Sequence, residues 1–148
     1  MGGMRTAFPA SMRILVADDD AIVRSVVERV AFQASYELLQ AEDGAQALRM
    51  LELEDPDVLI TDIHMPGLDG YELVSAVRAS ARHSAMPIVC LSAESDRDAV
   101  TRLASLGITD YLLKPFRPRD LSDRLATVIA RYGRWKLGRS ESLHRSRA

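Results

Sequence analysis

Asp62 closes an apolar run, Asp57 to Thr61, and opens a stretch of turn residues from His64 to Gly70. A carboxylate in this place is expected at the rim of a sheet rather than in its core. It can act there as a nucleophile and hold a phosphoryl group as a mixed anhydride. We therefore take Asp62 as a candidate phosphoryl acceptor.

Other charged residues follow comparable apolar runs. Asp18, Asp19 and Asp20 come after the run 14–17, and Lys114 comes after the run 111–113. Carboxylates delivered to one edge of a sheet suit Mg²⁺, which requires hard oxygen ligands and usually keeps several waters. Without the cation, clustered carboxylates should repel one another and raise the pKa of at least one of them. The pattern predicts a site for a divalent cation and a phosphoryl group.

Lys114 is the only lysine from Arg13 to Tyr132, where the other twelve basic residues are arginine. A compact, mobile ammonium differs from a planar guanidinium in how it contacts a phosphoryl group. Ser92 also falls at the carboxyl end of an apolar run. The alternative is that the charged and polar residues at these strand ends are ordinary solvated loop residues. That interpretation would have to be true of every one of them at once.

Short apolar runs alternate five times with segments of helical periodicity. The predicted strands are Arg13 to Ala17, Tyr36 to Ala41, Asp57 to Thr61, Pro87 to Ser92 and Thr109 to Leu113. Helices are predicted between them and after the last one. The pairs Asp69 with Glu72 and Ser95 with Asp98 have the spacing of capping boxes, and Pro118 suits a first helical turn.

The predicted strands are apolar throughout rather than alternating, which indicates a sheet that is covered on both faces. Five strand and helix units predict an α/β fold, a doubly wound parallel sheet with right-handed crossovers. In such sheets, ligands bind beyond the carboxyl ends of the strands. The candidate site residues all lie at those ends.

Length and composition predict one domain with a real core, since the chain has 148 residues and is 47% hydrophobic. The single cysteine, Cys90, lies in an apolar run, so no disulfide within the chain can form and a reducing cytoplasm is the expected location. No stretch approaches the roughly 20 apolar residues of a membrane span. We expect neither a membrane segment nor membrane association.

Charge divides the chain into an acidic body and a basic end. Residues 133–148 carry a net charge of +4, which leaves −6 for the rest of a chain whose total is −2. Gly and Ser residues interrupt any apolar period in this end, so it cannot bury enough surface to offset its ordering entropy. We expect residues 1–12 to be a flexible extension, residues 13–132 to be the domain, and residues 133–148 to be a mobile tail.

These motifs together closely resemble one family, the receiver domains of two-component response regulators. The resemblance covers about Arg13 to Tyr132. It rests on the aspartate pair after the first strand, an aspartate followed by Met-Pro-Gly-Leu-Asp-Gly after the third, Ser-Ala after the fourth and Lys-Pro-Phe after the fifth. It implies a flavodoxin-like sheet with strand order 2-1-3-4-5 and five helices.

The resemblance assigns roles residue by residue. It implies that Asp62 is phosphorylated and that Mg²⁺ is held by Asp18, Asp19, Asp62 and the backbone carbonyl of His64. Lys114 would contact the phosphoryl group, and Ser92 and Tyr111 would form the switch.

The resemblance also implies secondary features around the site. His64 and Glu94 would tune the lifetime of the phosphoryl group, while Asp20 is not a ligand. The bond between Lys114 and Pro115 would be cis, where trans is otherwise the default.

The same resemblance implies a phosphoryl donor, either a histidine kinase or a histidine phosphotransfer protein. It implies a downstream protein that binds the face of the fourth helix, fifth strand and fifth helix; a homodimer is also compatible, and direct nucleic-acid binding is not expected. The chain would not be an enzyme beyond Mg²⁺-dependent self-phosphorylation and slow autodephosphorylation. The 16 residues after Tyr132 are too few for a further domain. The chain is thus a stand-alone regulator, a relay intermediate or part of a larger protein.

Two other classes of function remain open. A haloacid-dehalogenase-type phosphatase would use Asp18 as nucleophile and Asp20 as acid, with Ser92 and Lys114 contacting phosphate. That class leaves Asp62 without a purpose, and the chain has no room for a cap domain. A phosphorylation-independent interaction module would normally have lost the acidic pair or Lys114, and both are present.

Overall fold

Five strands and five helices alternate strictly along the chain in the computed structural model, which describes residues 12–93, 95–108 and 110–132. The strands are β1 (Arg13–Ala17), β2 (Glu37–Ala41), β3 (Val58–Asp62), β4 (Ile88–Ala93) and β5 (Asp110–Lys114). The helices are α1 (Ala21–Gln33), α2 (Gly44–Glu54), α3 (Gly70–Ala79), α4 (Arg97–Ala104) and α5 (Pro118–Tyr132). Each predicted strand lies within one residue of its observed limits.

All neighbouring strands pair in parallel, and their order across the sheet is β2-β1-β3-β4-β5. This is the doubly wound parallel sheet that the sequence patterns predicted, with the flavodoxin-like strand order that the resemblance implied. Because all strands run the same way, their carboxyl ends form a single edge. Asp62 and Lys114 are the last residues of β3 and β5, so the topology places both at that edge.

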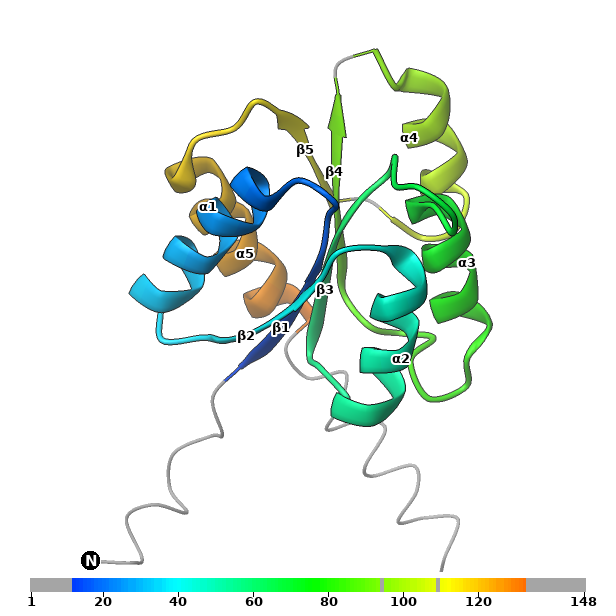
Figure 1. Cartoon of the computed structure of the whole chain (residues 1–148), viewed down its shortest axis with the longest axis horizontal. Coiled ribbons are helices and arrows are strands. Elements are labelled where there is room, and N and C mark those ends of the chain that lie inside the picture. The colour runs from blue at the N-terminus through cyan, green and yellow to red at the C-terminus, as the bar shows by residue number, and fades with distance from the viewer. Residues whose placement is uncertain (1–11, 94, 109, 133–148) are drawn as a thin grey trace, which may run out of the picture.

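Helices cover both faces of the sheet, with α1 and α5 on one side and α2, α3 and α4 on the other (Figure 1). Alternate residues of a strand point to opposite faces, so each strand contributes to two cores. On β1, Ile14 and Val16 pack in the core beneath α1 and α5, whereas Leu15 and Ala17 pack in the core beneath the other three helices. This double burial explains why β1, β3 and β4 are almost entirely buried, whereas the edge strands β2 and β5 also carry exposed residues.

Aspartate side chains cap three of the helices. Asp20, Asp43 and Asp69 stand at the N-caps of α1, α2 and α3, and each carboxylate accepts a hydrogen bond from a backbone N–H of the first helical turn. Asp69 and Glu72 form the complete capping box that their spacing predicted.

Helix α4 begins differently from these three. The predicted capping box of Ser95 and Asp98 is wrong, because α4 starts at Arg97 and its N-cap residue is Asp96. The Asp96 side chain makes no cap hydrogen bond, although aspartate is among the preferred N-cap residues. The reason is that this carboxylate bonds to other groups beside the site.

Gly70 lets α3 begin directly against the end of β3. A Cβ atom at this position would lie 2.1 Å from the carbonyl oxygen of Asp62 and 2.7 Å from the Cα of Ile63. The Gly70 N–H donates to the Ile63 carbonyl at 2.8 Å. The absence of a side chain at Gly70 therefore sets how closely α3 packs beneath the candidate acceptor.

The predicted N-terminal extension, apart from Met12, and the predicted tail lie outside the described residues, so both stay predictions. The Lys114–Pro115 peptide bond is cis, as the resemblance implied. Among the described residues, no helix is long and apolar enough to cross a membrane.

Candidate functional site

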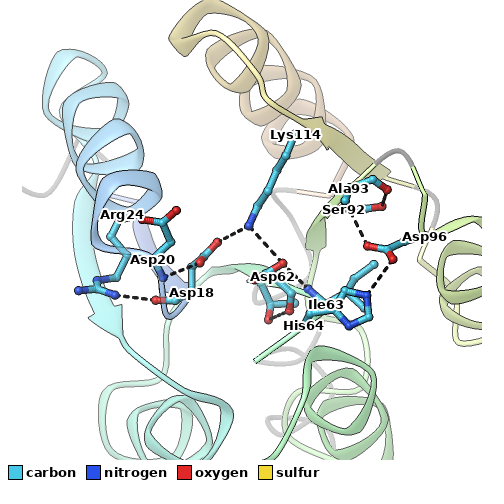
Figure 2. A network of polar contacts seen from close by, with 11 residues as sticks. Asp18, Asp20, Arg24, Asp62, Ile63, His64, Ser92, Ala93, Asp96 and Lys114 are labelled. Atoms are coloured by element: carbon cyan, nitrogen blue, oxygen red, sulfur yellow. Dashed lines mark hydrogen bonds and ion pairs between the residues drawn. The ribbon is translucent and has the colours of Figure 1, made fainter. Parts of the chain in front are cut away.

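Three charged side chains from three strand ends meet at the carboxyl edge of the sheet (Figure 2). The ammonium nitrogen Nζ of Lys114 lies 3.0 Å from Asp18 Oδ2 and 3.2 Å from Asp62 Oδ1. Asp18 is fully buried and Asp62 is 8% exposed. One lysine therefore bridges two largely buried carboxylates, as the strand-end rule predicted.

Backbone groups hold each carboxylate in place. Asp62 Oδ1 accepts a hydrogen bond from the N–H of Ile63 at 2.8 Å, and Asp18 Oδ1 accepts one from the N–H of Asp20 at 2.9 Å. The Arg24 guanidinium of α1 donates to the Asp18 carbonyl oxygen at 2.7 Å. Asp18 is thus fixed by both its side chain and its backbone.

Asp19 completes an acidic cluster. One carboxylate oxygen from each of Asp18, Asp19 and Asp62 lies within 4.8 Å of the others. Asp19 is exposed while the other two are buried, so the cluster opens to solvent on the Asp19 side. Three carboxylates against one ammonium leave two negative charges, and this set of hard oxygen donors fits Mg²⁺.

Burial raises the pKa of Asp62, and the nearby charge of Asp18 raises it further, while Lys114 acts in the opposite direction. Burial by itself would lower the pKa of Lys114, but its contacts with Asp18 and Asp62 outweigh that effect and the pKa is raised. Lys114 therefore stays charged, and the ionised form of Asp62 is disfavoured. A cation or a phosphoryl group with its counterion can relieve this imbalance. The pKa of Asp62 is raised in the expected direction, and burial contributes more to the rise than repulsion by Asp18 does.

Ser92 lies near the same edge and Tyr111 lies three residues before Lys114 on β5, and neither residue joins this network. Ser92 is fully buried near the end of β4, and its hydroxyl donates to the Ala93 carbonyl at 3.0 Å. Tyr111 of β5 is 42% exposed. Both border a groove of about 380 Å³ between α4 and β5, which Val100 and Leu113 also line.

His64 turns away from the acidic cluster, with an exposed side chain in the β3–α3 loop. Its Nε2 lies 2.8 Å from Asp96 Oδ1, and this hydrogen bond raises the pKa of His64. Asp96 Oδ2 accepts a hydrogen bond from the N–H of Ala93 at 3.2 Å. Glu94, the other residue predicted to tune phosphoryl lifetime, lies outside the described residues.

Sequence reasoning missed Asp96. Only its type, a short acidic residue just before a helix, was visible as a signal, and that signal indicates a cap. The contact with His64 joins residues 32 positions apart, which no local pattern reports.

Asp20 caps α1 by accepting a hydrogen bond from the N–H of Ile22 at 2.8 Å. Within the described part of the chain, the cluster of groups that could hold a metal does not include Asp20. The phosphatase alternative needs Asp20 as an acid beside Asp18, so the geometry gives that alternative no support.

Known proteins resemble the chain in both sequence and structure. The response regulator receiver domain model matches residues 14–126. "Probable transcriptional regulator ycf27" of Guillardia theta is 39% identical over 120 residues, which cover 80% of this chain and 46% of that protein. The chain thus spans about half the length of this relative. The chemotaxis protein CheY of Pseudomonas aeruginosa is 33% identical over 121 residues, which cover 81% of this chain and 98% of CheY.

A solved structure has the same fold. The chemotaxis response regulator CheY4 of Vibrio cholerae superposes with a TM-score of 0.76 at 33% identity, over 80% of this chain and 99% of that chain. The fold, the family match and the arrangement of strand-end residues agree, and they do not favour the phosphatase alternative. The chain belongs to the family of response regulator receiver domains.

Proposed function

We propose that this receiver accepts a phosphoryl group on Asp62 from the phosphohistidine of a histidine kinase or a histidine phosphotransfer protein. The observation that carries the proposal is the position of Lys114 Nζ, which lies 3.0 Å from Asp18 and 3.2 Å from Asp62 at the open edge of the sheet. A lysine so placed neutralises charge where a phosphoryl group would arrive. Receiver domains are signalling modules rather than classical enzymes, and the reaction is a single transfer.

In that transfer, a carboxylate oxygen of Asp62 attacks the phosphorus atom of the donor. The bond between phosphorus and the donor imidazole nitrogen breaks, its electron pair returns to the ring, and an acyl phosphate forms on Asp62. Phosphoryl transfer requires mainly positioning and charge neutralisation. The Ile63 N–H fixes the carboxylate and Lys114 offsets the charge of the arriving oxygens.

Mg²⁺ fits the acidic cluster, with Asp18, Asp19, Asp62 and the backbone carbonyl of His64 as its ligands. When bound, it supplies positive charge to the phosphoryl oxygens. The same site supports self-phosphorylation from small phosphodonors and slow autodephosphorylation, whose rate His64 and Glu94 would tune.

Phosphorylation would be read at the face of α4, β5 and α5. The Ser92 hydroxyl would leave the Ala93 carbonyl and approach the phosphoryl group, and Tyr111 would rotate into the groove between α4 and β5. The groove and the exposure of Tyr111 support this route, which is a two-state element biased by a local charge. A downstream protein or a second copy of the chain would bind the altered face.

The wider biology is proposed on the same basis. We expect the protein to act in the cytoplasm, without binding nucleic acid directly through this domain and without membrane association. The named relatives include a transcriptional regulator and a chemotaxis protein, so the family accommodates different outputs. The basic tail after Tyr132 is proposed to be a linker.

The decisive experiment is titration calorimetry with Mg²⁺ and the phosphoryl mimic beryllofluoride. The wild type should bind the pair, Asp62→Asn should not, and Asp19→Ala should bind more weakly because one exposed ligand is lost. Mass spectrometry after incubation with acetyl phosphate should show one added phosphoryl group in the wild type and none in Asp62→Asn.

Unchanged beryllofluoride affinity in Asp62→Asn would overturn the assignment of the acceptor. Sustained hydrolysis of a phosphate ester that survives Asp62→Asn but is lost in Asp18→Asn would favour the phosphatase class. A wild type that binds its downstream partner equally with and without beryllofluoride would favour a phosphorylation-independent module.

The switch has a separate test. Ser92→Ala should still bind beryllofluoride, because the mimic attaches to Asp62, but it should transmit the change poorly to Tyr111. Identical beryllofluoride-induced NMR shifts around Tyr111 in the wild type and Ser92→Ala would show that coupling follows another route.

A further inference from the structure

Asp96 occupies an N-cap position without capping its helix. The other three N-cap aspartates have extended backbones, with ψ between 111° and 178°, and each accepts a hydrogen bond from its helix. Asp96 has φ −95° and ψ 37°, and its carboxylate points back toward the site. The first turn of α4 therefore lacks a favourable interaction that the same residue type supplies elsewhere in this protein.

The carboxylate of Asp96 instead joins the two loops that flank the site (Figure 2). Oδ1 contacts the ring of His64, in the loop after β3, and Oδ2 accepts from the N–H of Ala93, at the end of β4. The Ile63 N–H also bonds to the Leu91 carbonyl, so the segment after Leu91 runs beside the segment after Asp62. His64 thus follows Asp62 by two residues in the sequence, and Ala93 is brought near the acceptor by the pairing of these two segments.

We propose that Asp96 is a positioning residue with two alternative sets of partners. Before phosphorylation it holds His64 and the Ala93 N–H together, and after phosphorylation it releases them and caps α4 through the N–H groups of Asp98 and Ala99. This inference rests on the proposed function, since it requires new negative charge on Asp62.

Charge and hydrogen bonding give the physical reason. A phosphoryl group on Asp62 brings new anionic oxygens beside the loops that carry His64 and Ala93. These oxygens attract the same hydrogen-bond donors that Asp96 holds and repel its carboxylate. The N-terminus of α4 offers the released carboxylate N–H groups that the N-cap side chain does not bond in this structure, and a favourable helix dipole.

Helix α4 is short and weakly anchored, so gain or loss of an N-cap should change its order. Helix α4 has eight residues, and Leu103 is its only buried side chain. An N-cap contributes a large fraction of the stability of so short and lightly anchored a helix. Gain of the cap would order the start of α4, which lies in the face proposed to bind the downstream partner.

The experiment measures amide hydrogen exchange by NMR, with and without Mg²⁺ and beryllofluoride, in the full chain. In the wild type, the amides of residues 98 and 99 should exchange more slowly when the mimic binds, by about three- to tenfold, which corresponds to one hydrogen bond of ordinary net strength. Asp96→Ala should lose this gain. Asp96→Asn should protect these amides with the mimic as well as the wild type does, because asparagine caps helices as well as aspartate does. Part of this protection should already be present without the mimic, because the contacts with His64 and Ala93 are weaker.

Mimic affinity provides a second readout. Asp96→Asn weakens the hydrogen bonds of residue 96 to His64 and to the Ala93 N–H but keeps the helix cap. The state that competes with mimic binding is then disfavoured, so this variant should bind beryllofluoride about two- to fivefold more tightly. Asp96→Ala loses both sets of partners and should stay within about twofold of the wild type, since the two losses offset each other. The matched control Asp98→Ala removes the same charge from the first turn of α4 and should change neither readout.

Several results would overturn the inference. These are an unchanged exchange rate at residues 98 and 99 when the mimic binds the wild type, a full gain of protection in Asp96→Ala, and no tighter binding in Asp96→Asn. Each leaves the proposed function intact if Asp62→Asn abolishes mimic binding. Failure of the wild type to bind the mimic would overturn the proposed function and this inference together.

Discussion

Helices α3 and α4 lie on the same face of the sheet and follow neighbouring strands, yet they are anchored very differently. Helix α3 begins with a complete capping box and buries four residues: Gly70, Leu73, Val74 and Val77. Helix α4 has no side-chain cap and buries only Leu103. The first follows β3, which carries the proposed acceptor Asp62, and the second follows β4, which carries the proposed switch residue Ser92.

This difference indicates a division of labour. A phosphoryl acceptor must be held in fixed geometry, and dense packing beneath Asp62 provides that. A switch must move at low free-energy cost, and elements with few buried contacts open most readily. The site therefore lies between a densely packed part, made of β3 and α3, and a part with few buried contacts that can move more easily, made of the end of β4 and α4.

The largest expected effect contrasts the buried leucines of these two helices. Leu73→Ala should lower the free energy of unfolding by about 3–4 kcal/mol, because a fully buried leucine leaves a cavity in the central core. Leu103→Ala should lower it by only about 2 kcal/mol, because α4 can loosen locally. Urea unfolding measures both, and hydrogen exchange should show selective loss of protection in α4 for Leu103→Ala. Equal global losses with α4 unaffected would contradict the contrast.

The next effect tests how tightly α3 is seated beneath the acceptor. Gly70→Ala should destabilise the fold by about 2–3 kcal/mol, because its Cβ would meet the Asp62 carbonyl at 2.1 Å and force the backbone apart. Gly67→Ala is the matched control: Gly67 has φ +74° but no atom within 4 Å of an added Cβ. It should cost only about 1 kcal/mol of backbone strain. Similar losses in both variants would show that the close approach is unimportant.

A third prediction concerns the buried charge in the densely packed part. Asp62→Asn should raise the melting temperature at neutral pH without Mg²⁺ by roughly 3–5 °C, about 1 kcal/mol for a domain of this size. Burial raises the pKa of Asp62 in the folded state, so its ionised form is disfavoured there. Asp19→Asn, at an exposed side chain, should raise the melting temperature less.

The pH dependence of this difference has a definite sign. A folded-state pKa above the unfolded value contributes stability that is complete below the unfolded pKa and is lost as pH rises through the folded pKa. Wild type and Asp62→Asn should therefore converge in acid, where Asp62 is neutral, and diverge toward neutral pH. Mg²⁺ should stabilise the wild type more than Asp62→Asn. Calorimetric scans showing a constant difference at all pH values would rule out the buried charge as its source.

The smallest effect lies at the contact between the two helices. The guanidinium of Arg102 on α4 sits 4.0 Å from the centre of the Tyr71 ring on α3. Arg102→Ala should cost only about 0.5–1 kcal/mol, as expected for an exposed cation–π contact. Exchange should quicken in α4 and stay unchanged in α3. Arg97→Ala, the same charge change at the start of α4, should leave both helices as they are.

Much of this architecture was predictable from local patterns. The strands contain short apolar runs, so their positions could be predicted to within one residue, and the alternation with helices predicted the parallel sheet. Once a parallel sheet was predicted, Asp62 and Lys114 had to lie at the same edge of it, because each residue lies at the carboxyl end of its strand. The capping box at Asp69 followed from spacing alone.

The start of α4 shows where prediction stopped. The residues Ser95, Asp96 and Asp98 are all short and polar, and their spacing favoured Ser95 as the cap. In the structure Asp96 is the N-cap residue instead, so the helix begins one residue later than predicted. The Asp96 carboxylate bonds to His64 and to the Ala93 N–H rather than to the helix. Local spacing cannot resolve such a choice, because the competing partner, His64, belongs to a different loop.

The sequence by itself determined where the strands lie along the chain, at which edge of the sheet the charged residues gather, and which class of chemistry these residues suit. These follow from hydrophobic periodicity and from chain direction, which are local properties. Only the tertiary structure decided that Lys114 contacts Asp18, 96 residues away, as well as Asp62, and that Asp96 contacts His64, 32 residues away. Such contacts are competitions between groups of similar hydrogen-bonding strength, and the packing of whole elements settles them by setting which groups come within reach.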